Sequence, residues 1–403
     1  MHYDIAIIGA GPTGLSFACS LRDSGLQVVV IEKQARASLE SPKPDGRDIA
    51  LTHLSRRIMQ QHGSWQRIDP QQISPIEKAE VYDGDSPYSL SFVTPEDGTD
   101  ALGFLVSNFR IRQAIYEEFD TVDNATLLDG RRVIRVNTDD QGATLVLDDD
   151  QRISAELVIA ADTRFSDTRR QMGISSHSYD FGRSAILAWM DHEQPHQHTA
   201  FECFQYGRTM AILPLAGNRS SVVITLPSSQ VSQWLEMDRE QFAHEVQSGL
   251  DQRLGQMTQA SERFTYPLVG VHADRFCTTR YALIGDAAVG MHPVTAHGFN
   301  LGLSGQDLLA EGITSAIEQQ DEFWSDRVLR RYQQQHMLTT RPLYHGTNTV
   351  VGLFTNDSFP ATLLRKAVLR LSDKLPPVKW AITQKLMTKD HVMPDLASFF
   401  SRR

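Results

Sequence analysis

The first 32 residues of the chain alternate between strand, glycine-rich loop and helix in an order that few folds accommodate. Residues 4–8 read Asp-Ile-Ala-Ile-Ile, an apolar run of the kind that is buried on both faces of a parallel sheet. A Gly-x-Gly-x-x-Gly segment follows at 9–14 and opens a predicted helix over 15–24, which Gly25 ends. A second predicted strand at 27–31 leads into Glu32. The pattern therefore predicts a complete βαβ unit of a nucleotide-binding α/β domain.

The spacing of the three glycines explains how such a unit binds a dinucleotide. Gly9 permits the tight turn, Gly11 lets a pyrophosphate approach the helix N-terminus, and Gly14 lets the helix pack on the strand. Glu32 follows Gly9 by 23 residues, where a carboxylate accepts hydrogen bonds from ribose hydroxyls. A βαβ turn that binds no ligand is the alternative. The residues of this unit expected at the cofactor are Gly9, Gly11, Pro12, Thr13, Gly14, Glu32 and Lys33.

Two further segments extend this prediction near the end of a third strand, at 281–286. Asp286 either caps the helix that follows or binds the ribityl chain of a flavin. Residues 296–302 read Ala-His-Gly-Phe-Asn-Leu-Gly, where Gly298 lets backbone N–H groups face a flavin ring carbonyl and Asn300 fixes the loop. The combination of all three elements points to FAD.

Other motifs are spread over most of the chain. They are the strand 157–162 (Leu-Val-Ile-Ala-Ala-Asp), Gly285-Asp286-Ala287-Ala288, His292-Pro293 and Gly298-Phe299-Asn300-Leu301-Gly302-Leu303. With the fingerprint, they make the chain resemble the class A flavoprotein monooxygenases, whose fold is that of para-hydroxybenzoate hydroxylase. The likeness is greatest to the ubiquinone-biosynthesis hydroxylases, and within them it leans to the demethoxyubiquinol hydroxylase branch. It extends through Asp45-Gly46-Arg47, Ala50-Leu51, Tyr179-Asp180, Ala185, Pro195-His196, Ala200-Phe201-Glu202, Leu213-Pro214-Leu215, Phe354 and Asn356-Asp357.

The resemblance implies an α/β fold with three parts. A discontinuous, Rossmann-type FAD-binding domain is expected over 1–75, 99–182 and 271–335. A β-sheet substrate domain is expected over 76–98 and 183–270, and a C-terminal helical region over 336–403. The hydrophobic pattern also predicts a helix over 49–62 and strands within 76–98 and 183–226.

The resemblance also assigns site residues. Beyond the first βαβ unit, the cofactor contacts it implies are Arg47, Asn108, Arg112, Asp162, Gly285, Asp286, Pro293, Gly298, Phe299 and Asn300. No side chain is expected to act as a nucleophile, because the chemistry belongs to the flavin. The pocket candidates are His292, Pro293 and His297. By their residue type alone, Arg47 and Arg112 are equally well solvated cations.

Two positions depart from the family pattern. Thr163 stands where the family has glycine after the strand-end acid, with Ser166 and Arg169 retained. A β-branched residue disfavours positive φ, which puts the local backbone and its cofactor contact in doubt. His297 replaces the usual glutamine before Gly298, and a neutral polar loop residue is the preferred interpretation.

The activity implied by the resemblance is hydroxylation of an electron-rich ring, with O2 as the oxygen source and NAD(P)H as a transient electron donor. A prenylated phenol or quinol of ubiquinone biosynthesis is the expected substrate. A soluble aromatic hydroxylase, a prenyl-chain reductase or another flavoprotein of this fold is one alternative. A non-catalytic flavin-binding partner of a membrane biosynthetic complex is the other.

Composition limits which other kinds of partner, metal site and cellular location are expected for this chain. The net charge of −10 argues against nucleic acid as a partner, and the three scattered cysteines suggest neither disulfides nor a zinc site. No metal site is expected, and the histidines at 192, 196 and 198 are interpreted as a solvated turn. No signal peptide or run of 18 apolar residues is found, so a cytoplasmic location is expected.

The C-terminal segment differs in charge from the rest of the chain. Residues 360–403 hold nine basic and three acidic residues, a net charge of 9 − 3 = +6. Leu363, Leu364, Ala367, Val368 and Leu371 form one apolar face of a predicted helix. A basic amphipathic helix favours peripheral contact with the inner membrane face, whereas a helix packed on the core is the alternative. A biosynthetic complex or a homo-oligomer would also fit the chain.

Overall fold

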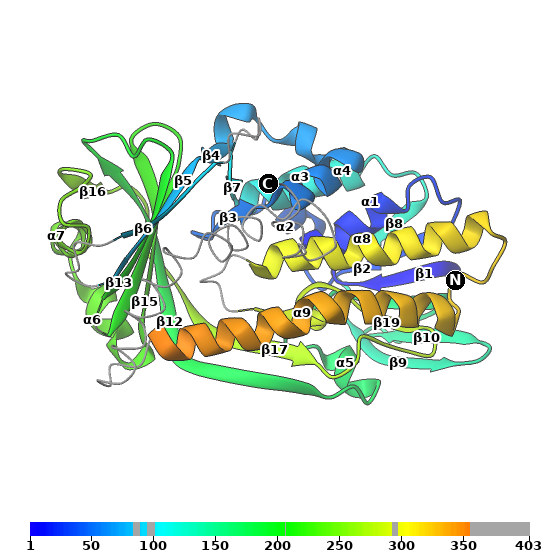
Figure 1. Ribbon diagram of the computed structural model, residues 1–403. Helices are drawn as coiled ribbons and strands as arrows, with labels where there is room; N and C mark the ends of the chain where they lie inside the picture. Colours follow the sequence, from blue (N-terminus) through cyan, green and yellow to red (C-terminus); the bar gives the residue numbers. More distant parts are fainter. Residues whose placement is uncertain (84–88, 95–100, 206, 292–296, 355–403) are drawn as a thin grey trace, which may run out of the picture.

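Two large sheets lie at opposite ends of the computed structural model, which describes residues 1–83, 89–94, 101–205, 207–291 and 297–354 (Figure 1). An eight-stranded sheet carries the nucleotide-binding unit, and a nine-stranded sheet forms the other end. A small sheet of β3 (Asp48–Leu51), β7 (Gly103–Ser107) and β4 (Ser74–Ile76) lies between them, with the strand order β3-β7-β4. The fold is the predicted α/β type.

The centre of the eight-stranded sheet is parallel, in the order β19-β11-β1-β2-β8. These strands are β1 (His2–Ile8), β2 (Val28–Ile31), β8 (Ala125–Leu128), β11 (Arg152–Ala160) and β19 (Tyr281–Leu283). The antiparallel strands β9 (Val133–Asp139), β10 (Gly142–Leu147) and β18 (Cys277–Thr278) extend it. Because the central strands are parallel, their carboxyl ends meet at one edge, where ligands bind in such sheets.

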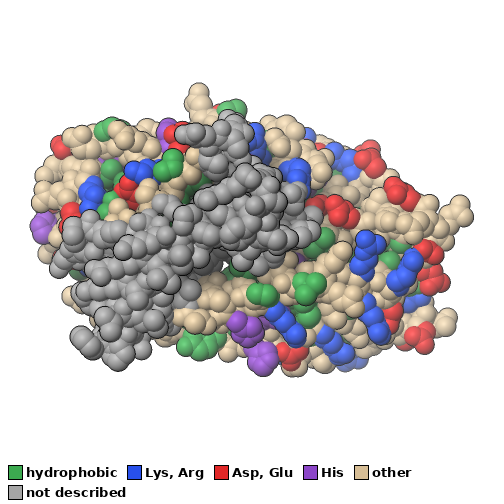
Figure 2. Space-filling view, viewed as in Figure 1, with side chains coloured by type: hydrophobic (Ala, Val, Ile, Leu, Met, Phe, Trp, Pro, Cys, Tyr) green, Lys and Arg blue, Asp and Glu red, His purple; other side chains and the backbone are tan. Residues whose placement is uncertain are grey.

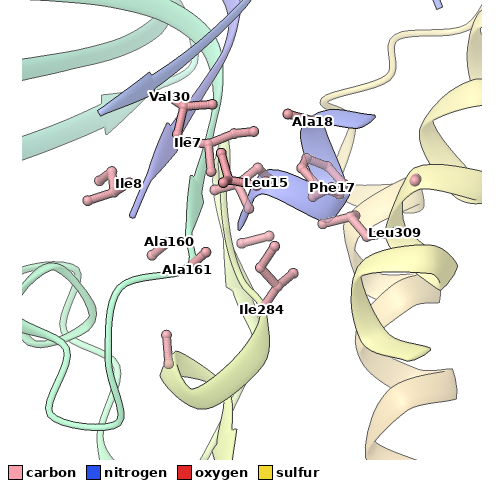
Figure 3. Close-up of a cluster of buried hydrophobic side chains, with 14 of the residues drawn as sticks. Ile7, Ile8, Leu15, Phe17, Ala18, Val30, Ala160, Ala161, Ile284 and Leu309 are labelled. Carbon is pink, nitrogen blue, oxygen red and sulfur yellow. The ribbon is translucent and has the colours of Figure 1, made fainter. Parts of the chain in front are cut away.

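Helices cover this sheet and build the larger core. α1 (Pro12–Ser20) and α8 (His297–Glu318) pack against each other. Leu15 of α1 lies next to Ile7, and Phe17 of α1 lies next to Leu309 of α8 (Figure 3). The other helices of this half are α2 (Arg36–Glu40), α3 (His53–Gln61), α4 (Asn108–Phe119), α5 (Asp167–Gln171) and α9 (Asp326–Phe354). The short 3-10 turns are Ser64–Arg67, Pro70–Gln72, Ser228–Gln230 and Gly285–Ala287.

The nine-stranded sheet has the order β20-β17-β12-β15-β14-β13-β5-β6, with β16 paired to β12. Its strands are β5 (Lys78–Asp83), β6 (Ser89–Val93), β12 (Ser176–His192), β13 (Thr199–Gln205), β14 (Arg208–Pro214), β15 (Arg219–Pro227), β16 (Met257–Gln259), β17 (Phe264–Ala273) and β20 (Val289–Gly290). α6 (Val231–Glu236) and α7 (Arg239–Gly249) cover its outer face, so its other face is turned toward the nucleotide-binding half (Figure 1).

The elements cross the predicted domain boundaries rather than breaking there. β12 continues through residue 182, β17 through residue 270, and α9 through residue 335. The two halves therefore share continuous strands and a continuous helix, and the division of the chain into domains stays a prediction. Among the described residues, no helix combines the length and the apolar character needed to cross a membrane.

One secondary-structure prediction is wrong at its start. The segment predicted as a helix over 49–62 begins as β3, where Ile49, Ala50 and Leu51 pair with β7. α3 begins only after Thr52, whose hydroxyl accepts a hydrogen bond from the Ser55 backbone N–H at 3.3 Å. A short apolar run fits a strand as well as a helix, and here the sheet partner decides the outcome.

Candidate active site

Thr13 lies where three sequence motifs meet at the carboxyl edge of the parallel strands. A Cβ on Gly285 would lie 3.0 Å from the Thr13 hydroxyl oxygen, and one on Gly302 would lie 2.9 Å from it. Gly9 has φ +106° and approaches the Ala161 carbonyl so closely that a Cβ there would lie 2.6 Å from its oxygen. The first fingerprint, the end of β11, the Gly285 turn and α8 therefore form one site.

Gly11 is the position that fits an absent ligand. It is the N-cap residue of α1, with φ −68° and ψ 171°, and a Cβ there would meet nothing within 4 Å. No side chain caps this helix, so its first N–H groups lack an intrahelical or side-chain partner. Gly14, by contrast, lies against the Gly9 carbonyl, where a Cβ would lie 2.1 Å from the oxygen. The space over Gly11 and the free helix N-terminus suit a pyrophosphate.

Glu32 is oriented by the main chain. Its side chain is buried, with 8% of the residue exposed, and its Oε2 accepts a hydrogen bond from the Ala10 N–H at 2.8 Å. Its Oε1 accepts from the Gln34 N–H at 2.9 Å. Each oxygen keeps a lone pair for a ribose hydroxyl. Lys33, next in the chain, is exposed.

Asp162 is held by hydroxyl groups after the end of β11. Its Oδ2 accepts from the hydroxyls of Ser166 at 2.9 Å and Thr168 at 3.2 Å, whereas its Oδ1 is buried without a partner in the described structure. Burial raises the pKa of this carboxyl, against the lowering effect of these hydrogen bonds. An unpartnered buried oxygen at the cofactor edge is a position for a ligand donor.

Thr163 causes no backbone strain. It is exposed and is not among the non-glycine residues with positive φ, so the family glycine is not needed for the turn. Ser166 instead caps α5, its hydroxyl accepting from the Arg169 N–H at 3.0 Å. Arg169 is 4% exposed and donates to the carbonyls of Ala287 at 2.7 Å and Arg164 at 3.0 Å, which joins this loop to the Gly285 turn.

Asp286 caps no helix. It lies inside the 3-10 turn Gly285–Ala287, which has no side-chain cap, and its Oδ2 accepts from the Arg164 guanidinium at 2.8 Å. Both side chains are partly exposed, at 41% and 30%. Arg164 also donates to the Val269 carbonyl at 2.9 Å, which links the turn to the nine-stranded sheet. The interpretation of Asp286 as the cap of the turn that follows the strand is therefore wrong.

Arg47 and Asn108 share one carboxylate. The Arg47 Nε donates to Asp45 Oδ2 at 2.9 Å, and the Asn108 side-chain nitrogen donates to the same oxygen at 2.8 Å. The Arg47 guanidinium also lies 5.4 Å from the ring centroid of Tyr266, whose hydroxyl donates to the Asp45 carbonyl at 2.7 Å. Arg47 is exposed, as the solvated-cation alternative expects, but its guanidinium is paired with Asp45 and lies at the contact between the two halves.

Arg112 differs from Arg47. It is half-buried on α4, and it has no hydrogen bond or ion pair with any residue in the described part of the chain. An unpaired guanidinium on α4, a helix that packs against α1, suits a phosphate, because its planar donors match phosphate oxygens.

Asn300 fixes the start of α8 against the loop after β3. Its Oδ1 accepts from the Thr52 N–H at 3.0 Å and from the Ser55 hydroxyl at 2.6 Å, and its Nδ2 donates to the Ala50 carbonyl at 2.9 Å. Gly298 and Phe299 precede it on the first turn and are half-buried. His297 begins this helix. His292 and Pro293 lie outside the described residues.

Several residues that join the site escaped the sequence prediction. Arg164 was missed although it lies two residues after the strand-end acid Asp162, a spacing that could have flagged it. Asp48 accepts from the Ser107 hydroxyl at 2.5 Å and from the Trp189 ring N–H at 2.8 Å, with its pKa raised by burial. No local pattern marks this contact, because Trp189 lies 141 residues away.

The three histidines interpreted as a solvated turn lie in a different environment. His192 and His196 are each 6% exposed, and burial lowers the pKa of both rings. They contact the Ser220 hydroxyl at 3.0 Å and the Leu215 carbonyl at 2.8 Å. The solvated interpretation is therefore wrong for these two. The described residues contain no group of three or more His, Cys, Asp or Glu side chains suited to a metal.

Comparison with known proteins places this arrangement in a family. The model of the family described as "FAD binding domain" matches residues 2–338. Ubiquinone hydroxylase UbiM of Neisseria meningitidis is 46% identical over 390 residues, which cover 96% of this chain and 85% of that protein. Ubiquinone hydroxylase UbiL of Rhodospirillum rubrum is 33% identical, with 93% and 87% covered. The 27% identity to 3-demethoxyubiquinol 3-hydroxylase of Escherichia coli, with 93% and 96% covered, does not single out that branch.

Solved structures share the fold at lower identity. PqsL of Pseudomonas aeruginosa has a TM-score of 0.74 at 19% identity, with 88% of this chain and 97% of that chain covered. The p-nitrophenol 4-monooxygenase PnpA of Pseudomonas putida has a TM-score of 0.74 at 17% identity, with 96% and 99% covered. The predicted fold and the FAD cofactor are confirmed, and the chain belongs to the FAD-binding-domain family as a class A flavoprotein monooxygenase.

Proposed function

We propose that this protein hydroxylates the aromatic ring of a prenylated phenol or quinol in ubiquinone biosynthesis, with O2 and NAD(P)H as co-substrates. The observation that carries the proposal is the 46% identity to a ubiquinone hydroxylase over nearly the whole chain. The site supports it, because the open position over Gly11, the oriented Glu32 carboxylate and the unpaired Arg112 together fit FAD.

In this proposal each group of residues has a separate task. The N-terminus of α1 binds the pyrophosphate and Glu32 binds a ribose. Asp286 and Asp162 orient the remainder of the cofactor at the strand ends, and Asn300 holds the loop that carries Gly298 and Phe299. Bound FAD supplies electron transfer from NAD(P)H to O2 and delivery of oxygen to the ring. The inner face of the nine-stranded sheet excludes water from the reacting ring.

The experiment that tests the function combines flavin identification with product analysis. The purified protein should be yellow, and the released cofactor should be FAD rather than FMN. With a panel of prenylated and unprenylated phenols, NAD(P)H oxidation should depend on substrate, and ¹⁸O2 should label the hydroxylated product. Deleting the gene should make one quinone precursor accumulate, which mass spectrometry identifies. FMN, or turnover only with unprenylated phenols, would contradict the proposal.

We also propose that residues 360–403, which lie outside the described residues, bring the protein to the membrane surface where a prenylated substrate resides. Figure 2 shows interspersed basic and acidic side chains on the described surface of one face, so the proposal relies on the +6 charge of this segment. Each basic residue adds about 1 kcal/mol near an anionic surface. The full chain should therefore co-sediment with vesicles of anionic lipids at low salt and stay in the supernatant at high salt. Vesicle binding that changes neither with salt nor on deletion of 360–403 would refute this membrane proposal.

A further inference from the structure

The nine-stranded sheet carries a row of directly opposed residues that extends across seven of its strands, from β6 to β17. Val81 of β5 lies opposite Leu90 of β6 and beside Glu202 of β13, and Glu202 lies opposite Ala211 of β14. The row continues with Val223, Leu187 and Phe264. Every member except Glu202 is apolar, so one carboxyl group stands in an otherwise apolar row.

The row lies on the face turned toward the FAD-binding half. Side chains alternate along a strand, so Glu202 shares its face with Ala200 and Phe204, which pack with Leu105 of the small sheet. Cys203 points the other way, into the core beneath α6 and α7. Figure 1 shows these two helices on the outer side of the sheet. Glu202 therefore faces the side on which the flavin site lies.

The middle of this row borders accessible space. Leu90 and Leu187, nearer its ends, are only 5% and 6% exposed. Val81, Ala211 and Val223 are half-buried, although they lie in the interior of a large sheet, and Glu202 between them is also half-buried. Phe264 at the far end is half-buried too, so the accessible stretch is the one from Val81 to Val223, between the buried Leu90 and Leu187. An apolar stretch of this kind suits an apolar ring lying against it.

Glu202 has no partner in the described part of the chain. No hydrogen bond or ion pair involves its carboxyl group, and its pKa is raised to about 7 by burial alone, without a contribution from any charged neighbour. The side chains around it on this face are the apolar groups of Val81, Ala200, Phe204 and Ala211. An unpartnered carboxyl in such a setting is costly unless a ligand supplies the donor.

We propose that Glu202 accepts the proton of the substrate ring hydroxyl and so prepares the ring for oxygen transfer, an inference that rests on the proposed function. The O–H bond breaks, the proton passes to a Glu202 carboxylate oxygen, and the electron pair stays on the ring oxygen. One oxygen atom of O2 enters the ring and the other leaves as water, with the two electrons supplied by NAD(P)H. When the ring regains aromaticity, its carbon releases a proton to water and the ring oxygen takes back the proton from Glu202.

This proton transfer is efficient only if the Glu202 carboxyl gains and loses a proton near the pH at which the enzyme acts. A general base operates best when its pKa lies close to that of the solution, and the carboxyl at about 7 meets this condition. The substrate that fits has a free ring hydroxyl and an apolar body. An O-methyl ether of the same ring offers no proton and should not benefit from Glu202.

The test compares FAD-loaded wild type and Glu202→Gln on a short-chain 2-prenylphenol, on a fluorinated analogue with a more acidic hydroxyl, and on the O-methyl ether. With the phenol at pH 7, hydroxylation by Glu202→Gln should fall by about 10²-fold or more. The loss should be smaller with the fluorinated phenol and absent with the ether. The wild-type rate should rise with pH around 7, whereas the variant should lack this rise.

Glu80→Gln is the matched control. Glu80 lies on the neighbouring strand β5, on the opposite face, where it pairs with Lys78 and Tyr82. The Glu80→Gln variant should hydroxylate the phenol at a rate within about two-fold of the wild-type rate. FAD affinity should be the same in all three proteins, which separates a role at the ring from a role at the cofactor.

The outcomes separate the two proposals. If the wild type forms no hydroxylated product from any phenol tested, the proposed function fails and this inference fails with it. If wild type and Glu202→Gln hydroxylate the phenol with equal rates and pH profiles, only the inference fails. Equal losses on the phenol, the fluorinated phenol and the ether would likewise overturn it, because they would indicate a packing role.

Discussion

Glu32 and Glu202 are carboxylates on the two large sheets, and their surroundings are opposite. Glu32 ends β2 with both oxygens fixed by backbone N–H groups of Ala10 and Gln34. Glu202 lies in the middle of β13 with no hydrogen-bond donor in the described part of the chain and apolar neighbours on either side.

The two carboxyl groups differ in where their hydrogen-bond donors come from. At the nucleotide edge the main chain supplies the donors, so the carboxylate is aimed before any ligand arrives and needs no proton exchange. On the inner face of the nine-stranded sheet the main-chain donors are used within the sheet, and the carboxyl gains a partner only from a ligand. The first arrangement suits a group that binds a cofactor, whereas the second suits a group that gains and loses a proton during turnover.

The largest effect is expected at the nucleotide edge, where Gly11→Val should abolish FAD binding. A Cβ at Gly11 meets no protein atom within 4 Å, so the side chain would extend into the open space where we propose that the pyrophosphate binds. The variant should purify colourless, and its thermal midpoint should match that of the wild-type apoprotein. Fluorescence titration with FAD measures the loss.

Gly14→Val provides the contrast. Its side chain would collide with the Gly9 carbonyl, so this variant should lose stability as well as FAD. If Gly11→Val instead kept its yellow colour, the view that its open space belongs to the cofactor would be refuted.

Asp286 adds a third carboxylate to the comparison of Glu32 and Glu202, one that is paired with the Arg164 side chain. The variant that tests it is Asp286→Ala. Losing a charge-assisted hydrogen bond to the ligand should cost about 1.5–3 kcal/mol, a rise in the FAD dissociation constant of roughly 10- to 150-fold. The partly exposed pair with Arg164 should contribute at most about 1 kcal/mol to stability. Equilibrium FAD binding and thermal unfolding measure the two effects.

Asp191→Ala is the control for this prediction. Asp191 forms an ion pair of similar exposure with Arg219, at 2.6 Å, within the nine-stranded sheet and away from the fingerprint. The Asp191→Ala variant should lose about as much stability as Asp286→Ala and keep the wild-type affinity for FAD. Identical FAD dissociation constants for Asp286→Ala and the wild type would show that Asp286 serves the fold alone.

The sequence was most informative where the determinants of structure are local. The glycine spacing, the following helix and the strand-end acid all lie within residues 9–32, and together they specify the βαβ unit. The start of the 49–62 segment was predicted incorrectly because Ile49 to Leu51 form a strand only when β7 is beside them.

Long-range partners account for the rest. Nothing near Asp286 reveals that Arg164 pairs with it, and nothing near His192 reveals that Ser220 buries it. Glu202 carried no sign of its role beyond the family likeness, because its isolation depends on the register of the two neighbouring strands, β5 and β14. Pairing partners across a sheet are not visible in a single sequence.

The smallest effect is a change in how stability depends on pH when Glu202 becomes glutamine. The pKa of the folded carboxyl is about 7, above its ordinary value of 4.5, so the folded state holds a proton that the unfolded chain releases. Wild-type stability therefore falls as pH rises from about 4.5 to 7, and Glu202→Gln lacks this fall. The thermal midpoint of the variant relative to wild type should rise across this window, by a shift on the order of 1–4 °C. Glu80→Gln should run parallel to the wild type from pH 5 to 8: burial raises the Glu80 pKa, but hydrogen bonds from Lys78 and Tyr82 outweigh it and lower the pKa overall, so Glu80 titrates below this range. Melting curves of the three proteins at pH 5, 6, 7 and 8 decide the matter, and parallel curves for wild type and Glu202→Gln would mean that Glu202 finds a partner after all.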